Sequence, residues 1–245
     1  MRIAVDFQTD KLPIAYRMAV LSIIKEAIKI GDPDTYSYYF EKKLTKSKPY
    51  ASAVYLRDFQ IGEPDIHLAG FRLHFTTSEY SVLLPLLRGL QNTSDFMYRH
   101  YQFKRTRIFL EPETRISSNK IIVSTMSPIL IEDERGKPVA PTDPHFNDHF
   151  NKITNRLSLS LRNTFLQTPI KMTPIFTDKR VVKELNHTFL ETRKSDSDYL
   201  TYTAYSGQFL MEGHPQDLQW LFDVGVGLRR GQSFGMLALE REVIE

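Results

Sequence analysis

The stretch GVGLRRGQSFGML, residues Gly225–Leu237, holds four of the 11 glycines in the chain. They stand at positions 225, 227, 231 and 235, and Arg229 and Arg230 lie between them. Glycine permits tight turns with positive φ and lets another backbone approach closely. Guanidinium groups donate charge-assisted hydrogen bonds that suit phosphates. The stretch therefore predicts a tight loop that can lie against a phosphate backbone.

This loop differs from the two common glycine-rich nucleotide motifs. A dinucleotide fingerprint, Gly-x-Gly-x-x-Gly, follows a strand and opens a helix, whereas here position 230 is arginine and the loop follows an expected helix. A phosphate-binding P-loop ends in Gly-Lys-Ser/Thr, which is absent. A helix C-cap that leads into a strand would explain Gly225 or Gly227, but not all four glycines.

Upstream of the loop, the first half of the chain alternates between strand and helix patterns. Period-two alternation and β-rich runs indicate strands, and apolar residues at helical spacing indicate helices. The first helix stops at Gly31, and the second is expected despite Pro85. Strands are expected at 1–7, 51–77 and 101–111, and helices at 15–32 and 79–92. The order β-α-β-β-α-β is that of a ferredoxin-like domain.

The second half repeats this order in pattern more than in residues. Strands are expected at 120–133, 170–177, 199–211 and 233–242, and helices at 146–165 and 214–227. We therefore predict an α+β fold of two tandem ferredoxin-like (βαββαβ) domains with a C-terminal glycine-rich loop. The expected division is into residues 1–118 and residues 119–245.

The composition excludes several classes of protein. A chain of 245 residues, 41% of them hydrophobic, suffices for one large domain or two small ones with their own cores. No apolar run reaches about 18 residues and no apolar segment follows the first basic residue, so neither a membrane span nor a secretory signal is expected. The absence of cysteine excludes disulfides and thiolate metal sites and fits the cytoplasm. The net charge of +3 is weak evidence for a nucleic-acid partner.

Three stretches together resemble the CRISPR repeat-processing endoribonucleases of the repeat-associated mystery protein (RAMP) superfamily. The first is a helix that runs into Gly225-Val226-Gly227, a basic pair, and Ser233-Phe234-Gly235-Met236. The second is STMSPILIED, at 124–133, and the third is the opening MRIAVDF followed by KLPIAYRMAVLSIIKEAI. The resemblance extends over the whole chain.

The resemblance implies binding and cleavage of CRISPR repeat RNA. In the family, a ribose 2′-hydroxyl attacks the adjacent phosphate without a metal or other cofactor and leaves a 2′,3′-cyclic phosphate and a 5′-hydroxyl. Precursor and mature RNA are the implied partners, and effector-complex subunits and a second copy of this chain are further candidates; a membrane is not. The implied RNA-binding residues of the loop are Gly225, Gly227, Arg229, Arg230, Gly231, Ser233, Phe234 and Gly235.

The segment after the first helix departs from the family pattern. Many relatives carry a histidine there, a lysine a few residues on and often a tyrosine nearby. In this sequence the histidine position falls at about Phe40, and none of the seven histidines lies in the segment. The implied catalytic candidates are therefore Lys48, Tyr38, Tyr39 and Lys46. Unperturbed tyrosine titrates near 10 and lysine at about 10.4, so such a site would be slower than one with histidine.

Other interpretations stay open. The chain could hold CRISPR RNA without cutting it, as a subunit of an effector complex, or a histidine could have been lost by substitution. It could also be a ferredoxin-like protein whose glycine loop only packs its domains. The tyrosines could be packing residues, and the lysines a solvated loop.

The strand HYQFKRTR, residues 100–107, is a second candidate for RNA contact. Because alternate residues of a strand share a face, Lys104 with His100, and Arg105 with Arg107, could line an RNA groove. A charged edge strand that prevents aggregation explains the same residues. His145 and His149, four residues apart, lack further ligands, so no metal site is expected.

Overall fold

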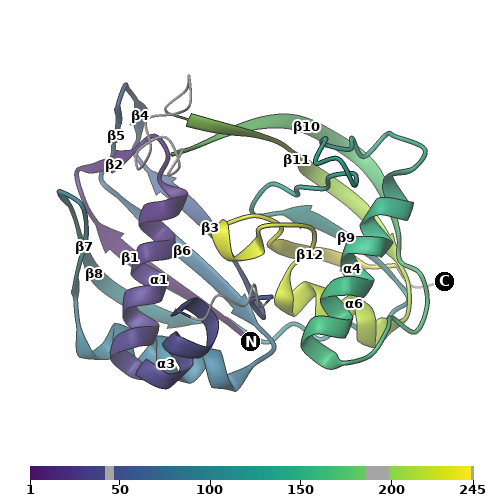
Figure 1. Ribbon diagram of the computed structural model, residues 1–245, viewed down its shortest axis with the longest axis horizontal. Coiled ribbons are helices and arrows are strands. Elements are labelled where there is room, and N and C mark those ends of the chain that lie inside the picture. Colours follow the sequence, from purple (N-terminus) through teal and green to yellow (C-terminus); the bar gives the residue numbers. More distant parts are fainter. Residues whose placement is uncertain (42–46, 186–198, 244–245) are drawn as a thin grey trace.

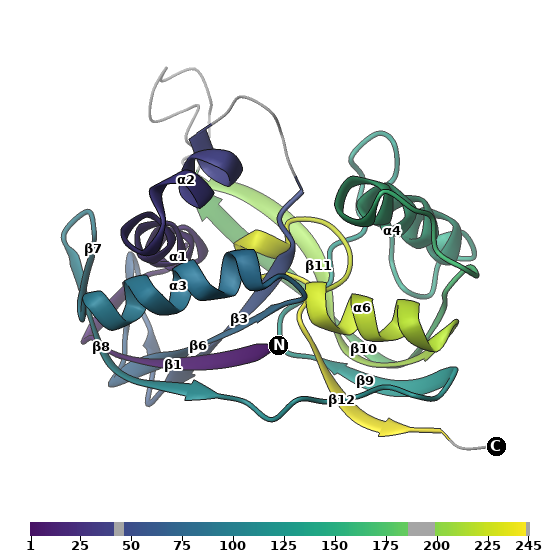
Figure 2. The same cartoon turned by 90° about the horizontal axis from the view of Figure 1, so that it is seen from below.

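The described residues form two main sheets that lie side by side, each covered by helices on the same side of the molecule, and a third, small sheet. The computed structural model describes residues 1–41, 47–185 and 199–243. Figure 1 shows the N-terminal half in purple to teal and the C-terminal half in teal to yellow. Figure 2, turned by 90°, shows the helices above both sheets. The covering helices are α1 (Arg17–Gly31), α3 (Tyr80–Asn92), α4 (Phe146–Arg162) and α6 (Pro215–Val224).

The N-terminal half is built on a five-stranded antiparallel sheet with the strand order β3-β6-β1-β8-β7. Its strands are β1 (Arg2–Gln8), β3 (Tyr50–Arg57), β6 (Gly70–Thr77), β7 (Asp95–Tyr98) and β8 (Tyr101–Leu110). A small sheet of β2 (Lys11–Pro13), β5 (Asp65–His67) and β4 (Gln60–Ile61) accompanies it. Without β7, the order is that of a ferredoxin-like domain.

Strand β1 shows why this half has two layers. Ile3, Val5 and Phe7 are completely buried and belong to the core that α1 and α3 cover. Asp6 lies on the other face, where Arg72 of β6 donates to it from Nε at 2.7 Å. Alternation along the strand thus separates an apolar face from a polar one, as the sequence pattern predicts.

Helix α1 passes into two short helical turns that position part of the site. Asp32 accepts a hydrogen bond from the backbone N–H of Asp34 and so caps α2 (Pro33–Tyr36), and Pro33 occupies its first position. A π-helical turn over Ser37–Glu41 follows directly. The tyrosine-rich segment is therefore helical as far as Glu41.

The C-terminal half repeats the topology with a four-stranded sheet of order β10-β11-β9-β12. Its strands are β9 (Lys120–Thr125), β10 (Lys171–Leu185), β11 (Tyr199–Glu212) and β12 (Leu237–Glu242). The long β10–β11 pair extends past β9 and reaches toward the N-terminal half (Figure 1). The predicted α+β fold of two tandem ferredoxin-like units is confirmed.

Two details of the glycine stretch differ from the sequence prediction. Helix α6 ends at Val224 because Gly225 adopts φ 80°, and the last strand begins at Leu237, four residues later than expected. Between them, Arg230–Gln232 form a 3-10 turn. The division at residue 118 stays a prediction; that position lies in the connection between β8 and β9.

The two halves meet along a seam of specific contacts. The guanidinium of Arg2 donates to the carbonyl of Phe222 at 2.9 Å and lies 3.6 Å from the centre of its ring. The Thr76 hydroxyl donates to the carbonyl of Asp223 at 2.9 Å. The hydroxyls of Ser52 and Ser233 are 3.0 Å apart and buried. Among the described residues, no helix has the length and apolarity that a membrane crossing requires.

Candidate functional site

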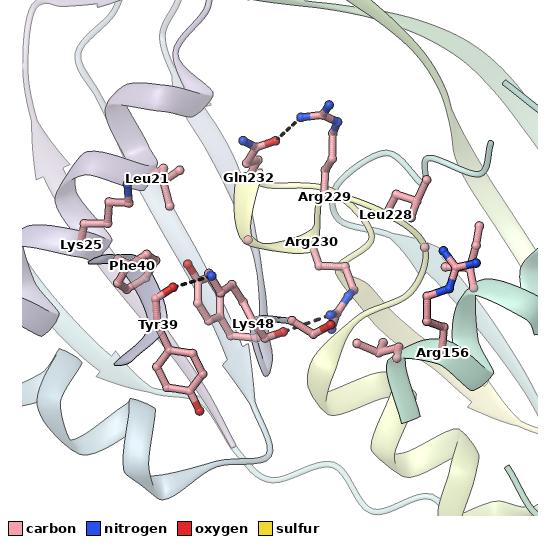
Figure 3. A pocket seen from close by; sticks show the side chains of 16 residues that line it. Leu21, Lys25, Tyr39, Phe40, Lys48, Arg156, Leu228, Arg229, Arg230 and Gln232 are labelled. Carbon is pink, nitrogen blue, oxygen red and sulfur yellow. Dashed lines mark hydrogen bonds between the residues drawn. The ribbon is translucent and has the colours of Figure 1, made fainter. Parts of the chain in front are cut away.

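A pocket of about 490 Å³ opens at the seam between the two halves (Figure 3). Helix α1, the π-helical turn and the start of β3 form one wall, and α4 and the glycine loop form the other. Its lining consists of Leu21, Lys25, Tyr39, Phe40, Ser47, Lys48, Tyr50, Ile153, Arg156, Leu157, Gly227, Leu228, Arg229, Arg230, Gly231 and Gln232. Segments that are about 180 residues apart in the sequence therefore share one site.

The charge of this lining is of one sign. It contains the basic residues Lys25, Lys48, Arg156, Arg229 and Arg230. Within the described part of the chain, neither a carboxylate nor a histidine lines the pocket. Such a concentration of cations in a concave site attracts anions strongly. The pocket therefore suits a phosphate-bearing ligand.

Lys48 is half-buried in the pocket, where its ammonium group shares the Phe40 ring with that of Lys25. Its Nζ donates to the backbone carbonyl of Tyr39 at 2.5 Å and lies 5.3 Å from the centre of the Phe40 ring. The Nζ of Lys25 lies 5.4 Å from the centre of the same ring. Burial, and then the neighbouring Lys25, lower the pKa of Lys48. An anion between the two lysines would relieve their repulsion.

Neither of the two tyrosine candidates places its hydroxyl group beside Lys48 in the pocket. Tyr39 lines it, but Figure 3 shows its ring pointing away from Lys48. Burial, and then Tyr38 and Glu79, raise the pKa of Tyr39, which makes it a poor base. Tyr38 packs edge-on against Tyr39, with ring centres 4.8 Å apart, and does not line the pocket. Lys46 lies outside the described residues.

Known proteins match this chain in sequence over its second half. Residues 110–239 match the family described as CRISPR associated protein Cas6, C-terminal. That span exceeds half of the chain. The chain belongs to the Cas6 family. A search of the curated proteins finds no match.

Solved structures share the fold of this Cas6 chain over its whole length. The product of a Cas6-related gene from Pyrococcus furiosus superposes with a TM-score of 0.80 at 17% identity, covering 99% of each chain. A RAMP protein described as binding different RNA substrates gives 0.77 at 16% identity, over 98% of this chain and 100% of its own. A CRISPR associated protein Cas6 gives 0.70 at 17% identity, over 98% and 99%. At these identities the likeness concerns the fold.

Most of the glycine loop of this Cas6 chain is buried against protein. Gly235 adopts φ +69°, and a Cβ there would lie 1.8 Å from the carbonyl oxygen of Val226. A side chain is therefore excluded both by conformation and by space. The other buried members of the expected RNA-binding set are Gly225, Gly227, Arg230, Ser233 and Phe234. These residues shape the loop, whereas Arg229 and Gly231 remain accessible on the pocket side.

The two arginines of the loop have different roles. Arg229 is exposed, lies 4.1 Å from the centre of the Tyr202 ring, and donates from Nη1 to Gln232 at 2.9 Å. Arg230 is buried and donates to the carbonyls of Val224 at 2.8 Å and Lys48 at 3.0 Å. Burial lowers the pKa of Arg230 to about 10, so it remains charged at neutral pH. Arg230 thus ties the loop to the chain at Lys48, and Arg229 is the one that faces outward.

The basic residues of β8 lie away from the pocket. A bulge between β1 and β8 places Arg105 opposite Phe7 and Arg107 opposite Asp6. Paired residues share a face, so Arg105 points to the helix side, where its Nε donates to the carbonyl of Thr93 at 3.3 Å. Lys104, opposite Gln8, and Arg107 point to the helix-free side. The expectation that Arg105 and Arg107 share a face was wrong because a bulge inverts the alternation.

The sequence reasoning missed Lys25 and Arg156. On α1, Lys25 lies one helical turn after Leu21, an apolar residue that also lines the pocket. On α4, Arg156 lies between the pocket residues Ile153 and Leu157. A basic residue at i, i+3 or i+4 from apolar seam positions is the available signal. That signal becomes specific only when it is known which helix faces the glycine loop.

A buried carboxylate near the loop gives a test of stability against pH. Glu184 of β10 is 5% exposed, and neither carboxylate oxygen has a hydrogen-bond partner among the described residues. Burial raises the pKa of Glu184 to about 7, against the opposing effect of Arg17 and then Arg229. Because the pKa is raised in the folded state, the contribution of Glu184 to the free energy of unfolding is fully present below its unfolded pKa near 4.5. That contribution is lost as the pH rises through 7.

We therefore expect Glu184→Gln to be more stable than the wild type at pH 8, by up to about 3 kcal/mol, and equal to it near pH 4. Urea unfolding at both pH values measures the difference. Glu240→Gln, at an exposed position of β12, serves as the matched control. A constant difference between Glu184→Gln and wild type at both pH values would contradict the assignment.

Proposed function

We propose that this Cas6 chain binds the repeat of CRISPR RNA with a phosphodiester held in the pocket at the seam. The observation that carries the proposal is the lining itself. It brings together the basic side chains of Lys25, Lys48, Arg156 and Arg229, and no carboxylate is found among its described residues. The phosphate backbone dominates the affinity of proteins for nucleic acid. The half-buried rings of Phe40, beside Lys48, and of Tyr202, beside Arg229, would add contacts with bases.

We further propose that the protein cuts the bound repeat slowly and without a metal. The ribose 2′-oxygen forms a bond to phosphorus and loses its proton to water, the bond from phosphorus to the 5′-oxygen breaks, and the 5′-oxygen takes up a proton. The products are a 2′,3′-cyclic phosphate and a 5′-hydroxyl. Lys48, Lys25 and Arg156 would stabilise the charge that develops on the phosphorane.

The absence of a histidine from the described lining favours a second candidate function. Histidine is the side chain whose ordinary pKa is near neutral, and without it proton transfer would contribute less to the rate. In that case the chain would bind and protect CRISPR RNA without cutting it, as a subunit of an effector complex. A second copy of the chain is compatible with either function.

Binding is tested with a labelled repeat RNA and the exposed Arg156. We expect Arg156→Ala to weaken binding and to lower the slope of log affinity against log salt by about one, because one phosphate contact is lost. The matched control is Arg135→Ala, exposed in the turn before α4 and outside the pocket. Equal loss in both variants would argue for a diffuse charge effect, and RNA binding by neither wild type nor variant would overturn the proposal.

Cleavage is tested with the same RNA in EDTA. Discrete products that persist in EDTA, end in a cyclic phosphate and vanish when the scissile nucleotide carries a 2′-deoxyribose would support the proposed chemistry. Tight binding with an intact RNA after long incubation would support the non-cleaving function instead.

A further inference from the structure

A second groove runs along the exposed side of α1 and joins the pocket. It has a volume of about 430 Å³, and Leu21 and Lys25 line both. Lys29 lies one helical turn beyond Lys25 and also lines the groove, so the positive charge of the pocket continues along the helix for about 6 Å. An RNA strand that enters the pocket can therefore leave it along α1.

The walls of this α1 groove carry two aromatic rings. Tyr36 comes from the end of α2 and Tyr98 from the end of β7, and both are half-buried. Figure 2 shows α2 and β7 beside α1. The Nζ of Lys29 lies 5.3 Å from the centre of the Tyr36 ring, and the guanidinium carbon of Arg99 lies 5.5 Å from that of Tyr98. Each aromatic wall thus has its own cation.

One polar atom of the groove is unsatisfied. The Tyr98 hydroxyl oxygen is enclosed and has no hydrogen-bond partner among the described residues. Because that oxygen is covered by protein, a ligand in the groove would meet the ring of Tyr98 and not its hydroxyl. Among the described residues, Glu26 is the carboxylate that lines the groove. It repels phosphate and accepts from amino groups, so the phosphates are expected on the side of Lys25 and Lys29, and a base edge toward Glu26.

We infer that the α1 groove binds one unpaired nucleotide of the RNA, next to the phosphodiester held in the pocket. The base stacks on Tyr98 or Tyr36, and its phosphate lies between Lys25 and Lys29. Alternating cations and aromatic rings along a groove are the general means by which proteins hold single-stranded nucleic acid. The inference rests on the proposed RNA binding and adds to it a path for the strand and a place for a base.

Photocrosslinking tests the path in the unaltered protein. A repeat RNA series carries 4-thiouridine at one position at a time, and crosslinked peptides are identified after irradiation. We expect one position, within about two nucleotides of the one held in the pocket, to crosslink to the peptide that contains Tyr98 or Tyr36. Crosslinks of every position to other peptides, with the wild type still binding RNA, would overturn the inference but not the proposed function.

Variants test the energetic role. We expect Tyr98→Leu to lower RNA affinity about ten-fold and Tyr98→Phe to retain most of it, because stacking needs only the ring. Tyr80→Leu, at a position of α3 that is 62% exposed, is the matched control. Thermal unfolding identifies any variant that fails to fold.

We expect Lys29→Ala to lower the slope of log affinity against log salt by about one, and Lys137→Ala to leave that slope unchanged. Wild-type affinity in both Tyr98→Leu and Lys29→Ala would overturn the inference.

Discussion

Replacing Lys48 by alanine is expected to slow cleavage of repeat RNA by about 100-fold or more, with a much smaller loss of RNA affinity. Lys48 lies in the pocket with a pKa lowered by burial and by Lys25, so its ammonium group is poorly solvated and close to where a phosphate would lie. Charge stabilisation in such a site acts more strongly on the transition state, where negative charge develops, than on the bound substrate. Single-turnover cleavage and equilibrium binding of a 2′-deoxy RNA separate the two effects.

The role of Lys48 can be divided further by a second substitution. If Lys48 acts through its charge, Lys48→Arg should recover most of the rate; if it transfers a proton, arginine should not, because guanidinium does not deprotonate near neutral pH. We expect recovery. The control is Lys152→Ala, on the exposed part of α4 outside the pocket. Since Lys48 also donates to the carbonyl of Tyr39, unfolding temperatures must show that the turn is intact. Unchanged cleavage in Lys48→Ala would remove Lys48 from the site.

The fold could be predicted because its signals are local. The core residues Ile3, Val5 and Phe7 of β1 recur at period two, the buried residues of α1 recur at helical spacing, and Gly225 marks the end of α6. These patterns record which face of an element is buried, and the order of elements then limits the topology. Two features were missed: the bulge that places Arg105 and Arg107 on opposite faces, and the late start of β12. Both come from pairing between strands, which leaves no local signal in the sequence.

The site was predictable only in part because it lies at the seam. The family resemblance made Lys48 a catalytic candidate and the glycine loop an RNA-binding candidate, and in the structure Arg230 joins them through the carbonyl of Lys48. The sequence could not show that Arg230 is buried while Arg229 is exposed, since adjacent identical residues look alike in a sequence. Arg156 belongs to α4 of the C-terminal half, and it shares a pocket with Lys48 and Lys25 because the two halves pack together. Residues that meet only through such packing need the structure.

Replacing Gly235 by alanine is expected to lower the unfolding temperature by roughly 10 °C. The new Cβ would meet the carbonyl oxygen of Val226 at 1.8 Å, and the residue would also be strained at φ +69°. Gly136 is the matched control, because it has φ +74° and nothing within 4 Å of a Cβ. Gly136→Ala therefore carries only the conformational cost, about 1–2 kcal/mol, or a few degrees in a chain of this size. Thermal unfolding of the two variants isolates the effect of close packing.

The same pair of variants decides what the glycine loop does. If the loop is mainly packed against protein, Gly235→Ala should lose stability first, and its RNA affinity, measured below the transition, should fall because the loop that carries Arg229 is displaced. If the glycines instead lie directly against an RNA backbone, Gly235→Ala should keep the unfolding temperature of Gly136→Ala and lose affinity alone. The carbonyl of Val226 already occupies the space at Gly235, and the amide of Val226 donates to the Gly235 carbonyl at 2.9 Å, so we expect the first result.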